Sequence, residues 1–178
     1  MTTQQQWSVV AATVMTVAFG VVLAMKIRPQ MDLIGAGSHA PNFTATDLRA
    51  NRQVTLTDYA GKVVLVNIWA TWCDPCRLEM PSMERLSQKL AGTDFRILAV
   101  SVDKDPPDVV MKFANDLGLH FDILQDRTGA VQGVLQTTGV PESFVIDRNG
   151  VVIKKIIGAA EWDAPVNETL VRRLLDGK

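Results

Sequence analysis

The sequence predicts an α/β fold with a parallel central sheet, preceded by one apolar segment at the N-terminus. From residue 63 onward, apolar runs typical of buried strands alternate with segments of helical character. An Asn149-Gly150 pair separates the last two strands, and the only two cysteines of the chain, Cys73 and Cys76, follow the first apolar run. Alternating strands and helices favour a parallel sheet, and an Asn-Gly turn favours an antiparallel pair at its edge.

The N-terminal segment has the length of a membrane span. Residues 1–6 are polar, and Trp7–Met25 is then almost wholly apolar until Lys26 and Arg28. About 20 apolar residues in a helix cross the hydrocarbon core of a bilayer, so we expect a single transmembrane anchor over residues 7–27. A signal peptide is the alternative, although no basic segment precedes the stretch and no clear cleavage site follows it. The two basic residues favour a cytoplasmic domain, but long domains can override so small a charge difference.

The remaining chain is expected to be a linker, residues 28–40, and one domain, residues 41–178. The linker contains proline, glycine and serine without a strong period. The domain begins with two short alternating segments, Phe43–Thr46 and Gln53–Leu56, joined by polar residues, which predicts a hairpin. Thr57–Gly61 is then expected to form one helical turn that ends at a glycine.

The next segments predict the centre of the sheet and the helix beside it. Val63–Trp69 is a continuous apolar run apart from Asn67, which is typical of a buried strand. Cys73–Leu90 is expected to be a helix, kinked at Pro81 because proline lacks a backbone donor. Phe95–Val102 is expected to be the next buried strand.

The pattern after residue 102 predicts a helix, a strand, a helix, two strands and a final helix. Their expected ranges are Asp105–Leu117, Phe121–Leu124, Thr128–Gln136, Ser143–Ile146, Val151–Ile157 and Ala164–Leu175. We expect Asp147 to cap the Asn-Gly turn and Asp163 to cap the last helix.

Charge and cysteine spacing narrow the function. The net charge of −1, without a basic stripe, gives no reason to expect a nucleic-acid partner. Two thiols three positions apart at a helix start can close a small disulfide, and the helix N-terminus stabilises the thiolate of Cys73. A purely structural disulfide is one alternative. A zinc site is another, but it needs about four ligands, and His39 and His120 are the only histidines.

Three motifs resemble those of membrane-anchored, thioredoxin-like proteins of the TlpA/ResA type, which are thiol–disulfide oxidoreductases of the thioredoxin superfamily. The motifs are Asn-Ile-Trp-Ala-Thr-Trp-Cys-Asp-Pro-Cys at 67–76, Gly-Val-Pro-Glu-Ser-Phe-Val-Ile-Asp at 139–147, and Ala-Pro-Asn-Phe at 40–43. The resemblance implies a thioredoxin-like fold with an N-terminal hairpin and a β–α unit inserted within Asp103–Thr138. It also implies extracytoplasmic thiol–disulfide exchange, often in cytochrome c maturation.

The resemblance also implies roles for the residues around the cysteines. Cys73 is the expected nucleophile and Cys76 the resolving thiol, with the Cys73–Cys76 disulfide as the redox centre and no metal or other cofactor. Asp74 and Pro75 are expected to tune the redox couple. A carboxylate beside Cys73 disfavours its thiolate and so makes the protein a weaker oxidant. Glu79, one helical turn beyond Cys76, is expected to relay a proton or to raise the thiol pKa values; an ordinary solvated glutamate is the alternative.

Four further residues are expected to contact the substrate. In the resembling proteins the proline at position 141 is cis and faces the disulfide, where the Val140 backbone can pair with an extended substrate. An ordinary turn proline is the alternative. Trp72 is expected to flank the sulfurs, and Glu142 to supply an acidic group at the rim.

These inferences predict a protein-disulfide reductase of the cytoplasmic (inner) membrane, single-pass, with its domain facing the periplasm or the cell exterior. We expect this side, although the flanking basic residues favour the cytoplasm, because a reducing dithiol has most use in an oxidising space. The expected substrate is apocytochrome c, and the expected electron donor is a membrane thiol transporter of the DsbD/CcdA kind.

Three other functions use related chemistry. The cysteines of a copper site in cytochrome oxidase are the second substrate class. A thiol peroxidase is less well supported because the P-x-x-x-T-x-x-C pocket motif is missing. A copper chaperone of the Sco type would need C-x-x-x-C and a partner histidine.

Overall fold

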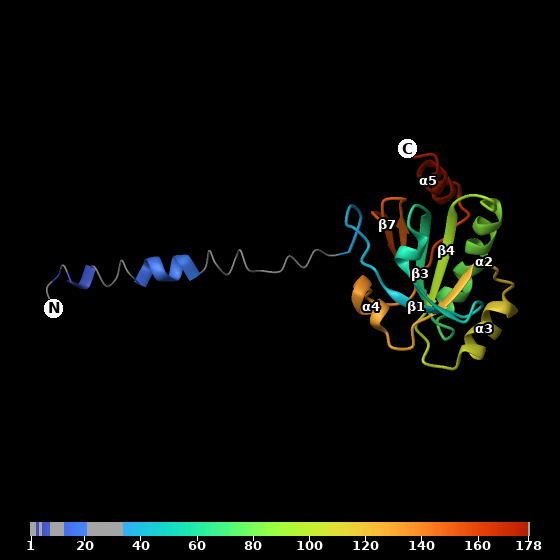
Figure 1. The fold of residues 1–178 in the computed structure, drawn as a ribbon, viewed down its shortest axis with the longest axis horizontal. Coiled ribbons are helices and arrows are strands. Elements are labelled where there is room, and N and C mark those ends of the chain that lie inside the picture. Colours follow the sequence, from blue (N-terminus) through green and yellow to red (C-terminus); the bar gives the residue numbers. More distant parts are fainter. Residues whose placement is uncertain (1–2, 4, 8–12, 21–33, 178) are drawn as a thin grey trace. The chain divides into compact units, whose positions relative to one another are not determined.

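The fold is built on a seven-stranded sheet. The computed structural model describes residues 3, 5–7, 13–20 and 34–177, and the sheet belongs to the second of two units, residues 33–178 (Figure 1). Its strands are β1 (Thr44–Asp47), β2 (Arg52–Thr55), β3 (Val63–Trp69), β4 (Phe95–Ser101), β5 (Asp122–Gln125), β6 (Glu142–Ile146) and β7 (Val152–Ile157). They lie in the order β2-β1-β5-β4-β3-β6-β7.

The sheet has a parallel centre and antiparallel edges, as the sequence predicts. β3 pairs in parallel with β4, and β4 with β5. The hairpin β1–β2 joins β5 antiparallel, and β6 and β7 continue antiparallel from β3. The carboxyl ends of β3, β4 and β5 therefore meet at one edge of the sheet, directly before the cysteines.

Helices cover both faces of the sheet. They are η1 (Leu56–Tyr59), α2 (Asp74–Lys89), α3 (Pro107–Asp116), α4 (Ala130–Leu135) and α5 (Pro165–Leu175). The side chains of β3 alternate between two cores: Leu65 and Trp69 pack with α2, α3 and α5, whereas Val64 and Val66 pack with η1 and α4. Figure 1 shows α2 and α3 together, away from α4.

The expected insertion and the last turn are both present. The segment Asp103–Thr138 contains α3, β5 and α4, so it adds a strand to the sheet and a helix to each face. Between β6 and β7, the Oδ1 atom of Asp147 accepts hydrogen bonds from the backbone N–H groups of Asn149 and Val151. Gly150 has a φ of +80°, which glycine adopts without steric cost.

The expected cap of the last helix is wrong. The residue that flanks the start of α5 is Ala164, without a side-chain cap, and Pro165 stands in the first turn. Proline fixes the helical φ angle and has no N–H that needs a cap. The Asp163 carboxylate instead accepts a hydrogen bond of 2.6 Å from Arg85 of α2. α2 runs over residues 74–89 with Pro81 inside it.

The first unit spans residues 1–32, and residues 13–20 are helical in it. In the part of the chain that the structure describes, no helix has both the length and the apolar character that a membrane span requires. The expected anchor over residues 7–27 includes residues 8–12 and 21–27, which lie outside the described residues.

Candidate active site

The two cysteines form a disulfide at the start of α2. The S–S distance is 2.06 Å and the Cα atoms are 5.3 Å apart. Cys73 flanks the helix as its N-cap residue, and its Sγ accepts a hydrogen bond of 3.2 Å from the Cys76 N–H. Cys73 is 5% exposed and Cys76 is 0% exposed, so an incoming thiol or disulfide has access to Cys73 alone.

The sequence folds this way because β3 ends directly before the motif. A turn follows Trp69, in which the Cys73 N–H donates to the Ala70 carbonyl oxygen at 3.2 Å. Asp74 and Pro75 then occupy the exposed first turn of α2. The N–H groups of a first helical turn have no partner inside the helix and stabilise a nearby anion. The reduced Cys73 sulfur therefore has a thiolate-stabilising position, with the Asp74 carboxylate beside it as the opposing charge.

Glu79 lies in the interior and not on the solvated face of α2. Its Oε1 accepts a hydrogen bond of 2.7 Å from the Asn67 side chain, and its Oε2 accepts one of 3.0 Å from the Ala160 N–H. Burial raises the pKa of Glu79, and these two hydrogen bonds, together with a weaker interaction with Trp162, oppose the rise. The alternative of a solvated glutamate is therefore wrong: Glu79 is a buried carboxyl group with a raised pKa.

Asn67 connects this carboxyl group to the strand that follows Pro141. Its side-chain nitrogen donates both to Glu79 and, at 2.9 Å, to the Ser143 hydroxyl of β6. Asn67 is the polar exception in the apolar run of β3, and it is completely buried. One amide therefore bonds two of the elements that surround the disulfide.

Pro141 lies at the same edge of the sheet as the disulfide. The Val140–Pro141 peptide bond is cis, as the resemblance implies. Because Ile68 pairs with Glu142 across β3 and β6, Pro141 falls level with the end of β3, where the chain turns toward Cys73. The Val140 side chain is partly buried against the core that contains both cysteines.

A groove of about 650 Å³ lies beside this loop, and Trp72 forms part of its wall. The Trp72 side chain is 67% exposed. The residues that line the groove come from the cysteine motif, the Val140 loop and the insertion: Trp72, Val102, Lys104, Asp105, Gln132, Gly139 and Val140. Trp72 and Val140 thus lie where a contact with a bound substrate is possible.

Glu142 does not lie at the rim, where we expected it. Its side chain is completely buried. One carboxylate oxygen accepts a hydrogen bond of 2.9 Å from the Thr138 N–H, and the other lies 2.8 Å from the Lys155 Nζ. A buried carboxylate needs such partners, so Glu142 holds the loop that contains Pro141 and does not face the groove.

Sequence reasoning missed Asp103. Its buried carboxylate accepts hydrogen bonds from the N–H and the hydroxyl of Thr71, at 2.9 and 2.7 Å, and from the Ser101 hydroxyl at 2.6 Å. The available signal was its place two residues after the end of β4, since the ends of neighbouring parallel strands meet at one edge of a sheet. Asp103 thereby bonds the residue two positions before Cys73.

An α/β sheet of this topology, with a C-x-x-C disulfide at a helix start and a cis-proline at the adjoining strand, defines a thioredoxin-like thiol–disulfide oxidoreductase. Residues 35–171 match the model of the Redoxin family. The chain belongs to this family, and within it the chain is similar to the ResA-type enzymes.

Two curated relatives show how far this similarity extends. The thiol-disulfide oxidoreductase ResA of Geobacillus thermodenitrificans is 40% identical over 141 residues, which cover 79% of this chain and 80% of the relative. ResA of Bacillus anthracis is 35% identical over 151 residues, covering 84% of this chain and 86% of the relative. The similarity therefore spans 79–84% of this chain and 80–86% of the relatives.

Solved structures agree with the fold. A thiol:disulfide interchange protein of the thioredoxin family from Chlorobium tepidum is 26% identical with a TM-score of 0.66, covering 78% of this chain and 97% of the other. A thiol:disulfide interchange protein from a Bacteroides species is 26% identical with a TM-score of 0.68, covering 81% and 92%. The predicted thioredoxin-like fold and the predicted thiol–disulfide oxidoreductase are thus confirmed.

Proposed function

We propose that this oxidoreductase is tethered to the cytoplasmic membrane, faces the extracytoplasmic side, and reduces disulfides in apocytochrome c. The observation that carries the proposal is the disulfide at the start of α2, which exposes Cys73 slightly and encloses Cys76. The apolar stretch Trp7–Met25 supports the tether. The Asp74 carboxylate supports the reducing direction. A strong disulfide oxidant has a stabilised thiolate in its reduced form, and the negative charge of Asp74 destabilises the Cys73 thiolate, so the protein is a weaker oxidant.

The exchange takes two steps. The Cys73 thiolate attacks one sulfur of the substrate disulfide, so that a Cys73–substrate bond forms, the substrate S–S bond breaks, and the released sulfur takes up a proton. The Cys76 thiolate then attacks the Cys73 sulfur, which closes the Cys73–Cys76 bond and releases the second substrate thiol. Two electrons pass from the Cys73–Cys76 dithiol to the substrate, and the structure corresponds to the oxidised product.

Cys76 must lose a proton before the second step. Glu79 stands one helical turn along α2, in the interior. A buried carboxyl group with a raised pKa is a better proton acceptor than a solvated one near neutral pH. We therefore assign it the role of receiving the Cys76 proton, directly or through water, since Asn67 is an amide and cannot do so.

The dithiol must be restored by an outside reductant. A membrane thiol transporter of the DsbD/CcdA kind would supply two electrons through an exchange on the same Cys73–Cys76 bond. The protein then needs no cofactor or metal of its own. The second substrate class, the cysteines of a copper site in cytochrome oxidase, would use the same chemistry.

Trapping of the mixed disulfide tests this proposal. In the full-length Cys76→Ser variant the second step cannot occur, so substrates should stay bound to Cys73 in the cell. The Cys73→Ser/Cys76→Ser double variant is the matched control and should capture none. Capture of apocytochrome c supports the proposal. Capture of copper-oxidase subunits alone would instead identify the cysteines of a copper site as the substrate. No capture by Cys76→Ser would contradict both.

A further inference from the structure

The segment that follows β4 forms one wall of the groove that Trp72 and Val140 also line. Val102, Lys104 and Asp105 come from the loop of residues 102–105, and Gln132 comes from α4. Trp72 stands at the same groove, directly before Cys73. The position of residues 102–105 relative to Trp72 therefore decides the shape of the space that a bound segment can occupy.

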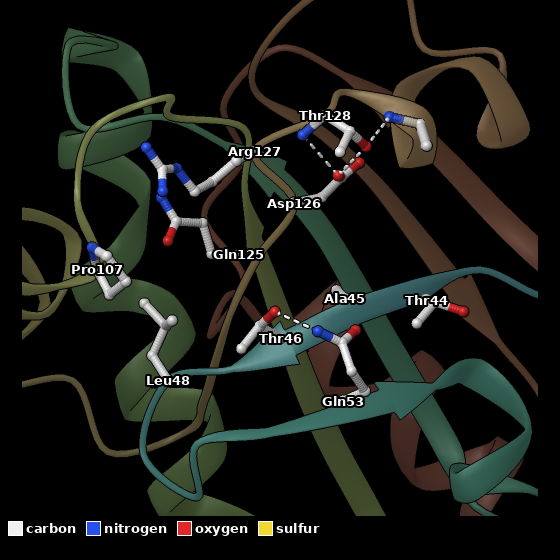
Figure 2. Close-up of a pocket in the computed structure, with 11 residues that line it drawn as sticks. Thr44, Ala45, Thr46, Leu48, Gln53, Pro107, Gln125, Asp126, Arg127 and Thr128 are labelled. Carbon is white, nitrogen blue, oxygen red and sulfur yellow. Dashed lines mark hydrogen bonds between the residues drawn. The ribbon is translucent and has the colours of Figure 1, made fainter.

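Two side chains hold this loop, one from the last residue of β5 and one from the turn directly after that strand. The carbonyl oxygens of three successive residues accept hydrogen bonds there. Gln125 donates to the carbonyl oxygens of Asp103 and Asp105 at 3.0 and 2.9 Å, and Arg127 donates to that of Lys104 at 2.8 Å. Figure 2 shows Gln125 and Arg127 side by side, at a separate pocket of about 500 Å³ between the N-terminal hairpin and the insertion. The backbone of each polar residue in this loop is thus held by the end of β5 or by the turn that follows it.

Asp103 holds the same loop to the cysteine motif. Its carboxylate accepts both donors of Thr71, the residue before Trp72, and the neighbouring Val102 N–H donates to the Trp69 carbonyl oxygen at 2.9 Å. Hydrogen bonds to an ionised carboxylate are about twice as strong as neutral ones. Within residues 34–177 the Asp103 side chain forms no ion pair, so hydrogen bonds from Thr71 and Ser101 hold its carboxylate in place.

We propose that Asp103 is a positioning residue, which fixes Trp72 and residues 102–105 as the two walls of a groove for an extended polypeptide beside the substrate cysteine. Trp72, Val102 and Val140 offer apolar contacts, and Lys104, Asp105 and Gln132 offer polar groups beside them. This pattern fits a peptide chain, with its alternation of side chains and backbone amides, better than a small disulfide. The inference rests on the proposed function, because it assumes that a protein disulfide is the substrate.

The test compares two substrates of the full-length protein. One is a disulfide-bonded peptide that contains C-x-x-C-H, and the other is bis(2-hydroxyethyl) disulfide, which has no chain to place in the groove. The Asp103→Ala variant should raise KM for the peptide about tenfold, which corresponds to roughly 1.4 kcal/mol. Its kcat for the peptide and its rate with the small disulfide should both remain within about twofold, a change of under roughly 0.5 kcal/mol.

Asp47→Ala is the matched control. Asp47 is also a buried carboxylate, and it accepts two backbone N–H groups at 2.9 and 3.0 Å in the turn of the N-terminal hairpin, away from the residues that line the groove. The Asp47→Ala variant should leave the KM and kcat for the peptide, and the rate with the small disulfide, unchanged. If Asp103→Ala does not fold, Thr71→Val removes only the hydroxyl hydrogen bond and should raise the same KM by about threefold, roughly 0.65 kcal/mol.

Three results would overturn the inference: an unchanged peptide KM, an equal loss with both substrates, or the same rise in Asp47→Ala. None of these affects the proposed function, provided that the wild-type protein reduces the peptide. A wild-type protein that reduces neither disulfide would contradict the proposed function and this inference together.

Discussion

Glu79 and Glu84 are two glutamates of one helix whose surroundings shift their pKa values in opposite directions. Burial raises the pKa of Glu79. Burial also acts to raise the pKa of Glu84, but hydrogen bonds from His120 and Gln88 outweigh it and lower that pKa. Both residues have an ordinary pKa of 4.5 and both accept hydrogen bonds. The comparison therefore shows at which site burial has the larger effect on the pKa and at which site the hydrogen bonds do.

The Glu79→Gln variant should lose a pH dependence of stability. The unfolded chain ionises Glu79 near 4.5, below the raised value of the folded state. Between these values the folded state binds more protons, so the wild-type free energy of unfolding falls as pH rises. Glutamine cannot ionise, and the fall should disappear. Urea unfolding of the oxidised protein across this range measures it.

The Glu84→Gln variant is the control for this prediction, with the opposite sign. The folded state ionises Glu84 below 4.5, so its contribution to stability is present above that pH and is lost as pH falls through the lowered value. A Glu79→Gln variant whose free energy of unfolding still falls like that of the wild type would contradict the raised pKa of the buried Glu79 carboxyl group.

Residue-level roles were predictable where a motif marks them, and not where they depend on distant partners. The spacing of Cys73 and Cys76 indicated the redox pair without any structure. The burial of Glu142 depends on Lys155, which lies on another strand, and no local pattern indicates this. Asp103 was missed for the same reason, because its partner Thr71 is 32 positions away.

At the scale of elements, the insertion belongs to the same core as the cysteine helix. Phe113 of α3 lies with its ring 5.1 Å from the ring of Trp69, the last residue of β3, measured between centroids. The Arg77 guanidinium of α2 stands 4.5 Å from the centroid of the same Phe113 ring. Three elements therefore meet at one aromatic side chain, directly beside the motif.

The Phe113→Ala variant should lower the free energy of unfolding by about 3–5 kcal/mol, because it leaves a cavity and removes an aromatic contact. Val109→Ala on the same helix is the control. Val109 is 42% exposed, and its variant should stay within about 0.5 kcal/mol. Urea midpoints at an unchanged m-value measure both. Equal effects of the two substitutions would show that the insertion is not packed into the core.

The ranges of most helices and strands were predictable because the hydrophobic periodicity and the turn residues that define them lie within each segment of the sequence. Val63–Trp69 was predicted at its observed bounds, since a buried strand is apolar along its whole length. The predicted start of α5 was wrong because an aspartate near a helix start has the same sequence pattern whether or not it caps that helix. The Asp163 carboxylate is bound to α2 instead. Arg85, the partner of Asp163, is far away in the sequence.

At the scale of the whole molecule, the parallel strands bring the functional groups of the site to one edge of the sheet. The ends of β3, β4 and β5 and the start of β6 supply, respectively, the cysteine motif, Asp103, Gln125 and the cis-proline loop. Order along the chain does not reveal this convergence, but sheet topology does. This edge therefore contains the Cys73–Cys76 pair, and we propose that the pair reduces a protein disulfide through Cys73.

Direct electron transfer tests this claim. The reduced full-length protein is mixed with the disulfide-bonded C-x-x-C-H peptide, quenched with acid, alkylated and analysed by mass spectrometry. We predict that one Cys73–Cys76 disulfide forms for each peptide disulfide reduced, and that Cys73→Ser reduces none. A peptide that stays oxidised beside the reduced wild-type protein, or a Cys73–Cys76 bond that dithiothreitol cannot reduce, would contradict it.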